Sequence, residues 1–147
     1  MKKTILTMFA LSTVVFALGM RAAEKGAKPA AISHGAKVTL TDNLVAGKIT
    51  VFDFYSKYCG PCMRLSPALD KLHTKRDDLA VVKVDIQRPS IKGGIDWKAP
   101  VIQQFKIQSL PHLKIYDAKG KLMAEGDKAM NIVSKWLEAI GEKNPLR

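Results

Sequence analysis

The chain has 147 residues, 47% of them apolar, which excludes a disordered chain and predicts a single domain with a packed core. Its 24 Lys and Arg residues exceed its 13 Asp and Glu residues, so the formal net charge is +11. These basic residues are scattered and do not cluster with aromatic residues, so we expect no nucleic-acid partner. The charge is typical of a solvated surface, with loose attraction to anionic membranes or acidic partners as the alternative.

The N-terminus shows the three parts of a secretory signal peptide. Two lysines precede an apolar run over residues 5–18, and Gly19 supplies a small residue at the cleavage point. The run of about 14 residues is short for a membrane-spanning helix, which needs about 20. We therefore predict a cleaved signal peptide over residues 1–19 and a periplasmic or otherwise exported protein. An uncleaved segment that anchors the domain in the membrane is the alternative.

Residues 20–36 are rich in Ala, Lys and Gly and are typical of a flexible leader, which places the folded domain at residues 37–143. We expect a short first strand at Lys37–Leu40. The segment Ile49–Tyr55 is nearly all apolar and rich in β-branched and aromatic residues. This pattern is typical of a strand covered on both faces.

A helix is expected to begin near Cys59, because Pro61 suits the first turn of a helix. Apolar residues then recur at helical spacing on one face: Cys62, Leu65, Leu69 and Leu72. Pro67 interrupts this run and is expected to kink the helix. The next apolar segment, Leu79–Ile86, predicts a strand. The order of strand, helix and strand predicts a right-handed crossover between two parallel strands.

The second half of the chain predicts a loop, a helix, a hairpin and a last helix. The loop is Gln87–Ala99, which contains Pro and Gly breakers, and Pro100–Phe105 follows as a short helix. His112–Tyr116 and Lys121–Glu125 are expected to form an antiparallel hairpin. The last helix carries an apolar stripe of Ala129, Ile132, Val133, Trp136, Leu137 and Ile140. We therefore predict an α/β protein with a central mixed β-sheet and helices on both faces.

The chain has two cysteines, Cys59 and Cys62, separated by Gly60 and Pro61. A disulfide in an exported protein is ordinarily structural. A bridge between residues this close together encloses almost no chain, so it constrains the unfolded state little and is a poor staple. The pair is therefore predicted to carry out dithiol–disulfide exchange.

The position of the pair at a helix start predicts which cysteine reacts first. Cys59 would face free backbone N–H groups and the positive end of the helix dipole, which favour its thiolate form. Cys62 lies one turn inside the helix and would remain a thiol until the second step. We expect Cys59 to attack a substrate disulfide and Cys62 to resolve the mixed disulfide.

A proton must leave Cys62 in that second step, and Asp53 is the candidate acceptor. It is the lone carboxylate in an otherwise apolar strand that ends just before the cysteine pair. Burial would raise the pKa of this carboxyl group and suit it to proton exchange near neutral pH. A solvated aspartate at the end of the strand is the alternative.

Three segments resemble the thioredoxin family. The run Val51–Cys62 is similar to the family's active-site segment, which has Asp six residues before the first Cys and Pro five after the second; Asp53 and Pro67 match both. The run Ile107–Leu113 resembles the family's cis-proline loop. The run Val81–Asp85 resembles the strand whose Lys lies close to the buried Asp.

The resemblance implies the thioredoxin fold and adds residues to the site. Pro111 would form a cis peptide bond and lie across from Cys59. The backbone at Leu110 would pair with an extended substrate segment, as an added strand does. Lys83 would lie close to Asp53.

Three features depart from the family pattern. Tyr58 stands where the family usually has Trp, which leaves a smaller aromatic wall beside the first Cys. His112 stands where the family often has Thr, and it is expected either near the two sulfurs or as a strand residue with no role. The loop Gln87–Ala99 is longer than in the simplest members, and we expect its Trp97 to pack as a plug, with a contact for a partner as the alternative.

Gly60 and Pro61 resemble the dipeptide of reducing thioredoxins, so we expect a reductant of disulfides in exported proteins. Such a protein would receive electrons from a membrane thiol donor, and we expect a monomer with no cofactor or bound metal. Two alternatives remain. The first is a periplasmic dithiol oxidase or isomerase of the same fold, and the second is a carrier of a soft metal such as copper that uses Cys59, Cys62 and His112.

Overall fold

The computed structural model of the chain describes residues 28–146. Its strands are β1 (Ala31–Ile32), β2 (Ile49–Tyr55), β3 (Leu79–Asp85), β4 (His112–Tyr116) and β5 (Leu122–Glu125). Its helices are the 3-10 helix η1 (Leu40–Asn43) and the α-helices α1 (Gly60–Lys75), α2 (Pro100–Phe105) and α3 (Gly126–Ala139). The signal peptide predicted over residues 1–19 and the leader up to residue 27 lie outside the described residues.

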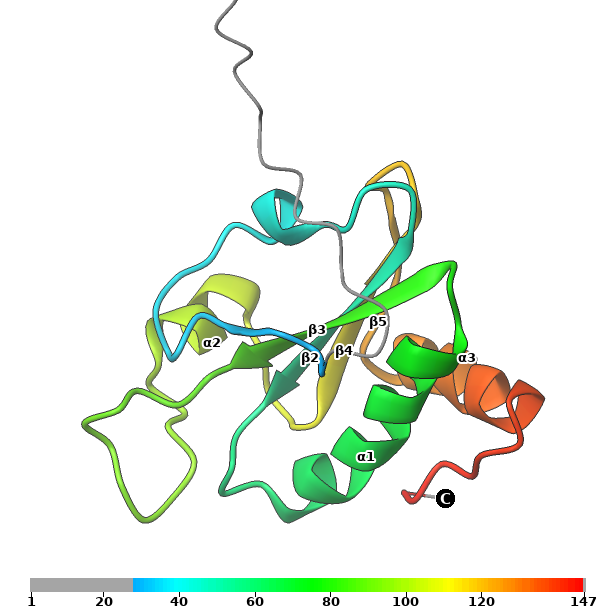
Figure 1. Cartoon of the computed structure of the whole chain (residues 1–147). Helices are drawn as coiled ribbons and strands as arrows, with labels where there is room; N and C mark the ends of the chain where they lie inside the picture. The colour runs from blue at the N-terminus through cyan, green and yellow to red at the C-terminus, as the bar shows by residue number, and fades with distance from the viewer. Residues whose placement is uncertain (1–27, 147) are drawn as a thin grey trace, which may run out of the picture.

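The strands form one mixed sheet in the order β1-β3-β2-β4-β5, with β2 at its centre (Figure 1). β1, β3 and β2 are parallel, whereas β4 and β5 run antiparallel to their neighbours. This arrangement confirms the α/β class and the parallel crossover from β2 through α1 to β3. In the register of the sheet, Asp53 of β2 lies between Lys83 of β3 and Leu113 of β4.

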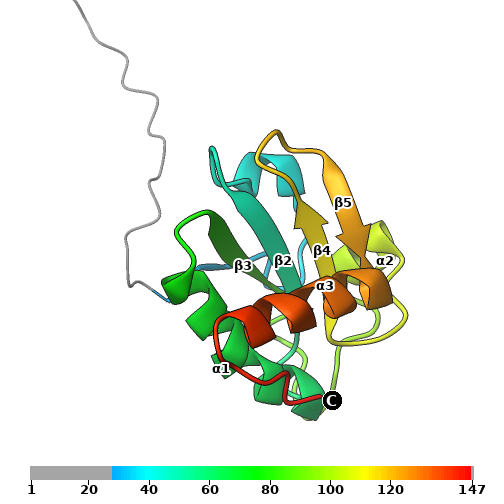
Figure 2. The same cartoon turned by 90° about the vertical axis from the view of Figure 1, so that its right-hand side faces the viewer.

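Helices cover both faces of the sheet, which explains why β2 is apolar along nearly its whole length. α1 and α3 cover one face, and α2 and η1 cover the other (Figures 1 and 2). Val51 packs against α1 and α3, whereas Phe52 and Phe54 pack on the side of α2. This alternation places Asp53, which lies between the two phenylalanines, on the α1 face.

The first strand differs from the prediction. Lys37–Leu40 forms no strand, and the chain pairs earlier, where Ala31 and Ile32 lie beside β3. Packed structure therefore begins inside the segment expected to be a flexible leader over 20–36. Its pairing depends on the free edge of β3, which a sequence pattern of two residues cannot report.

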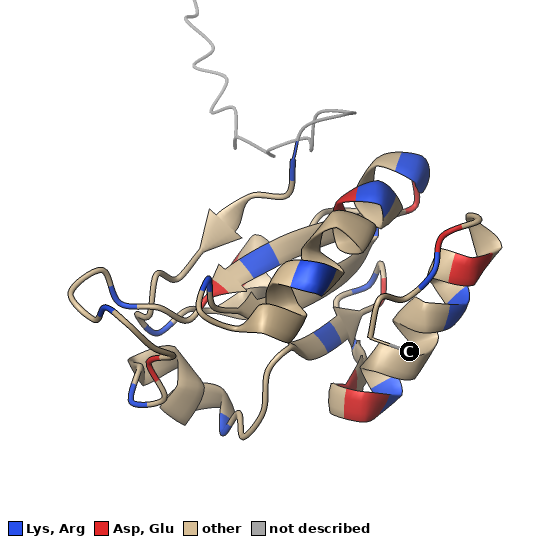
Figure 3. Cartoon of the chain, turned by 90° about the horizontal axis from the view of Figure 1, so that it is seen from below, with Lys and Arg blue, Asp and Glu red and all other residues tan. Residues whose placement is uncertain are grey.

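Pro67 does not end α1, and ordered structure continues after α3. α1 runs through Pro67 without ending. After α3, the buried side chain of Asn144 donates a hydrogen bond to Ser134 Oγ at 2.7 Å, and Leu146 packs against the core, so ordered structure continues beyond residue 143. No helix within residues 28–146 has the length and apolar character needed to cross a membrane. Lys and Arg residues are spread over helices, strands and loops (Figure 3).

Candidate active site

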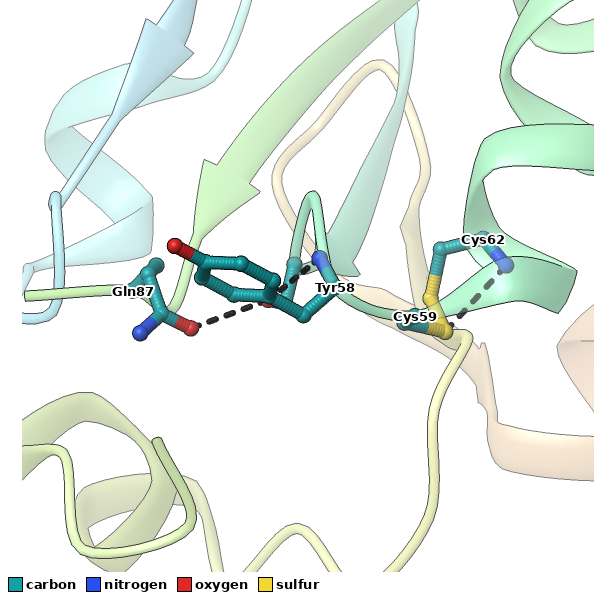
Figure 4. Close-up of a disulfide and its surroundings, with 5 residues drawn as sticks. Tyr58, Cys59, Cys62 and Gln87 are labelled. Carbon is teal, nitrogen blue, oxygen red and sulfur yellow. Dashed lines mark hydrogen bonds between the residues drawn. A yellow bond between two sulfur atoms is a disulfide. The ribbon is translucent and has the colours of Figure 1, made fainter. Parts of the chain in front are cut away.

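Cys59 and Cys62 form a disulfide at the N-terminus of α1 (Figure 4). Cys59 is the N-cap residue, and the backbone N–H of Cys62 donates a hydrogen bond to Cys59 Sγ at 3.2 Å. Pro61 fits the first turn because its position needs no backbone donor. The N–H group that contacts Cys59 Sγ in the disulfide is available to a Cys59 thiolate in the reduced protein.

The two cysteines are both buried, with 3% of Cys59 and 1% of Cys62 exposed. Between them Gly60 and Pro61 are exposed. The turn that joins the cysteines is therefore the part of the pair that faces solvent. The order in which the cysteines react, with Cys59 attacking and Cys62 resolving, stays a prediction.

Asp53 is buried in the centre of the sheet, which corrects the alternative of a solvated strand end. Only 1% of the residue is exposed, and its Oδ1 atom has no hydrogen-bond partner. Burial raises the pKa of Asp53 from 3.8 to about 7, against a lowering effect of the Lys83 charge. The carboxyl group can therefore take up and release a proton near neutral pH.

Lys83 lies directly beside Asp53 in the β2–β3 register, as the resemblance implied. Its ammonium group is held by α1, because Nζ donates to Ser66 Oγ at 2.5 Å and lies 2.8 Å from Asp70 Oδ1. Ser66 and Asp70 were not predicted as site residues. Their spacing of four residues on one helix was the available signal, but only the packing of α1 on β3 shows that they meet Lys83.

The Leu110–Pro111 peptide bond is cis, as the resemblance implied. Leu110 and Pro111 are both half-buried, and the Leu110 side chain packs with the core on the α2 side of the sheet. They immediately precede β4, whose first residues pair with the end of β2. The loop therefore lies at the end of the sheet where β2 finishes and the chain continues toward Cys59.

His112 packs on the opposite side of the sheet from Asp53. Its ring lies edge-on to the ring of Phe54, with 5.9 Å between the centroids. Burial and the nearby Lys114 charge lower the pKa of His112. In the described part of the chain, no three His, Cys, Asp or Glu side chains gather in a way that could hold a metal, so Cys59, Cys62 and His112 do not form such a group.

A buried hydrogen-bond chain connects the cysteine turn to the loop after β3, and sequence reasoning missed it. The Tyr58 N–H donates to Ser56 Oγ at 3.1 Å, and the Ser56 hydroxyl donates to Gln87 Oε1 at 2.9 Å (Figure 4). Gln87 Oε1 also accepts from the Asp96 N–H at 3.3 Å. The backbone before Cys59 is therefore fixed to the 87–99 loop, which tightens the position of Tyr58.

The 87–99 loop is held by its own buried carboxylate. Asp96 is 4% exposed and binds Arg88 through two contacts, Nε to Oδ2 at 2.5 Å and Nη2 to Oδ1 at 2.9 Å. Trp97, expected to be a packing plug, is instead 42% exposed. The polar Gln87 and Asp96 fill the interior of the loop, so the indole is not needed there.

A family model named Thioredoxin matches residues 36–139. Thioredoxin of Mycobacterium tuberculosis is 32% identical over 92 residues, which cover 55% of this chain and 72% of that protein. The structure of Trichomonas vaginalis thioredoxin matches with a TM-score of 0.53 at 20% identity, covering 80% of this chain and 99% of that one. A thioredoxin f2 solved in complex with ferredoxin:thioredoxin reductase matches with a TM-score of 0.54 at 23% identity, covering 78% and 96%.

Proposed function

This chain belongs to the thioredoxin family and is a thiol–disulfide oxidoreductase with the pair Cys59 and Cys62, and we propose that it reduces disulfides of exported proteins. The observation that carries the proposal is the disulfide at the start of α1, where the Cys62 N–H contacts Cys59 Sγ. That contact favours the Cys59 thiolate, the form that attacks a disulfide.

The proposed first step uses the reduced protein. Cys59 Sγ attacks one sulfur of the substrate disulfide, a bond forms between them, and the other substrate sulfur leaves as a thiolate. The Cys62 thiol then gives its proton to the Asp53 carboxylate, and its sulfur attacks Cys59 Sγ. The Cys59–Cys62 bond forms, the mixed disulfide breaks, and the substrate has gained two electrons.

The proposed roles of the other residues follow from their places. Asp53 is the proton acceptor, supported by its burial and by a pKa of about 7. Leu110 and Pro111 receive an extended segment of the substrate at the cysteine edge of the sheet. Tyr58, fixed through Ser56 and Gln87, forms the wall on the other side.

The reducing direction is supported by Gly60 and Pro61, which resemble the dipeptide of reducing thioredoxins. Potentials within the fold span about −270 to −120 mV, and the reducing members lie at the lower end. A measured potential near −250 mV would agree with the proposal. A potential above about −170 mV would instead identify the alternative, an oxidase or isomerase of the same fold.

The exported location is supported by the N-terminal sequence alone, with its two lysines, apolar run and Gly19. An exported reductant must regain two electrons after each cycle. We propose that a membrane thiol protein supplies them, by attack on the Cys59–Cys62 disulfide. A thioredoxin f2 with the same fold was solved in complex with ferredoxin:thioredoxin reductase, a reductase partner of that protein.

The test is to trap substrates in the native host with a Cys62→Ala variant that keeps its own N-terminus. Without Cys62 the mixed disulfide at Cys59 persists, so substrates remain attached and can be identified after non-reducing purification. The matched control is the double variant Cys59→Ala, Cys62→Ala, which should capture none of them. Capture of disulfide-containing exported proteins supports the proposal, and capture of cytoplasmic proteins alone would contradict the exported role.

A further inference from the structure

The ammonium group of Lys83, a residue of β3, contacts two side chains of α1. Its Nζ donates to Ser66 Oγ at 2.5 Å and lies 2.8 Å from Asp70 Oδ1. Ser66 and Asp70 are four residues apart on α1, so they lie on successive turns of one helix face. The Asp70 Oδ1 atom is buried and has no directed hydrogen bond, so its contact with Lys83 is an ion pair.

The same lysine lies next to the buried carboxyl group of the site. Lys83 and Asp53 are partners in the parallel register of β2 and β3, and their side chains share the α1 face of the sheet. Asp53 Oδ1 nevertheless has no hydrogen-bond partner. The ammonium group nearest to Asp53 is thus engaged by a second carboxylate on the helix.

We propose that Asp70, together with Ser66, is a positioning residue that holds the Lys83 ammonium group on α1 and so keeps the Asp53 carboxylate able to accept a proton. The inference rests on the proposed role of Asp53 as the acceptor of the Cys62 proton. An ammonium group free to pair with Asp53 would stabilise the carboxylate and weaken it as a base. Asp70 prevents this by neutralising the lysine from the other side.

The charged and titratable groups around Asp53 agree with this arrangement. The Lys83 charge lowers the pKa of Asp53, and the Asp70 charge raises it. β4 places the apolar Leu113 beside Asp53. α1 adds buried Leu65 and Leu69 on this face, and α3 adds buried Ala129, Val133 and Leu137. Tyr55 and Asp85 are paired at the C-terminal ends of β2 and β3, two residues beyond Asp53 and Lys83.

The experiment compares Asp70→Asn with the unchanged protein in two measurements. The first is the pKa of Asp53 from carboxyl carbon NMR shifts of the oxidised protein, in which the cysteines do not titrate. The second is the pH profile of kcat/KM for reduction of a disulfide. We expect Asp70→Asn to lower the pKa of Asp53 by about one unit and to move the acid limb of the profile by the same amount.

The matched control is Asp78→Asn, which also removes one carboxylate from the protein. Asp78 is exposed and pairs with Arg76 at the far end of β3, on the order of 15 Å along the strand from Lys83. It should leave both measurements unchanged. An equal shift in the control would show a general charge effect and overturn the proposal.

The variant Lys83→Met tests whether Asp70 acts through the lysine. It should raise the pKa of Asp53, opposite to Asp70→Asn. In the double variant, the Asp70→Asn change should shift the pKa by less than about half of its effect in the presence of Lys83. A full shift without Lys83 would mean that Asp70 acts directly, and no shift in either background would mean that it has no effect; both overturn the positioning role.

The two measurements separate this inference from the proposed function. If the pKa of Asp53 moves as expected while the acid limb of kcat/KM stays in place, Asp70 positions Lys83 but Asp53 is not the acceptor, so the proposed role of Asp53 fails. If both move together, both proposals are supported. If thermal unfolding shows that Asp70→Asn does not fold, Ser66→Ala removes the other contact that holds Lys83 on α1 and should also lower the pKa of Asp53; an unchanged pKa in that variant would overturn the positioning role.

Discussion

Two buried aspartates lie in different regions of this molecule and behave oppositely. Asp53, in the centre of the sheet, is 1% exposed, and Asp96, in the 87–99 loop, is 4% exposed. Burial raises the pKa of Asp53, whereas the hydrogen bonds and charge of Arg88 hold the pKa of Asp96 below its usual range. Solvent exposure is similar, but Asp53 lies deep in the sheet and Asp96 lies in a loop beside Arg88, so the depth of burial and the charged partner together decide the outcome.

The difference separates a carboxylate that stabilises the fold from one that can exchange a proton. Arg88 contacts both oxygens of Asp96, so the ion pair stays charged and fixes the loop. Lys83 is shared with Ser66 and Asp70, so Asp53 is left with an unsatisfied oxygen and a movable proton. A buried carboxylate that lacks a dedicated partner is costly to the fold, which is a reason to look for a function.

The largest expected effect is on how stability depends on pH. The folded-state pKa of Asp53 is raised from 3.8 to about 7, so the folded state binds the proton more tightly than the unfolded state. The contribution of Asp53 to the free energy of unfolding is largest below about pH 4. It falls by about 4 kcal/mol as the pH rises to 7. Urea unfolding from pH 4 to 8 should show this fall in the unchanged protein and lose it in Asp53→Asn.

The next prediction concerns activity. Asp53→Asn removes the proposed acceptor of the Cys62 proton, and we expect the rate of disulfide reduction at pH 7 to fall by about 100-fold. Asp96→Asn is the matched control because it makes the same chemical change in a carboxylate that is also shielded from solvent, and it should retain most of the activity. A similar loss in both variants would mean that the two carboxylates do not differ in role.

Stability is expected to show the reverse order for the same two variants. Asp96→Asn leaves Arg88 without its charged partner and should lower the free energy of unfolding at pH 7 by about 2 kcal/mol. Asp53→Asn should instead be neutral or stabilising at this pH. Because the pKa of Asp96 is lowered, its contribution is present above pH 4 and is lost as pH falls through the folded-state value.

The smallest expected effect comes from His73, a base that must stay neutral. Its Nδ1 accepts a hydrogen bond from the Val81 N–H at 2.9 Å, and burial lowers the pKa of His73. Stability from this bond is present above pH 6.5 and is lost as pH falls through the lowered pKa. His73→Leu should cost about 1 kcal/mol at pH 7 and less at pH 5.

The control for this prediction is His34→Asn, because the side chain of His34 is 60% exposed and Asn tolerates its left-handed backbone, with φ of 49°. Urea unfolding at the two pH values should show little change in that variant. An equal loss for His73→Leu at pH 7 and pH 5 would show that its packing matters and its hydrogen bond does not. In that case the contrast between partnered and unpartnered buried groups would apply to the aspartates alone.

Local patterns in the sequence predicted the elements that carry the site. The apolar β2 run, the start of α1 at Cys59 and the hairpin of β4 and β5 follow from periodicity and turn residues, which depend on near neighbours in the chain. The strand at Ala31–Ile32 and the partner of Asn144 were not predictable in this way. The first depends on the unpaired edge of β3 and the second on the buried hydroxyl of Ser134, and both partners lie far away in the sequence or on another element.

The sequence by itself determined the chemistry of this protein: two cysteines at the start of a helix, with one carboxylate in the strand before them. The tertiary structure alone decided the state of each charge, by pairing Arg88 with Asp96 and by placing Lys83 between Asp53 of β2 and Asp70 of α1. The physical reason is that the pKa of a buried group depends on atoms within a few ångströms. Those atoms come from strand order, helix packing and the path of a loop, which no local spacing records.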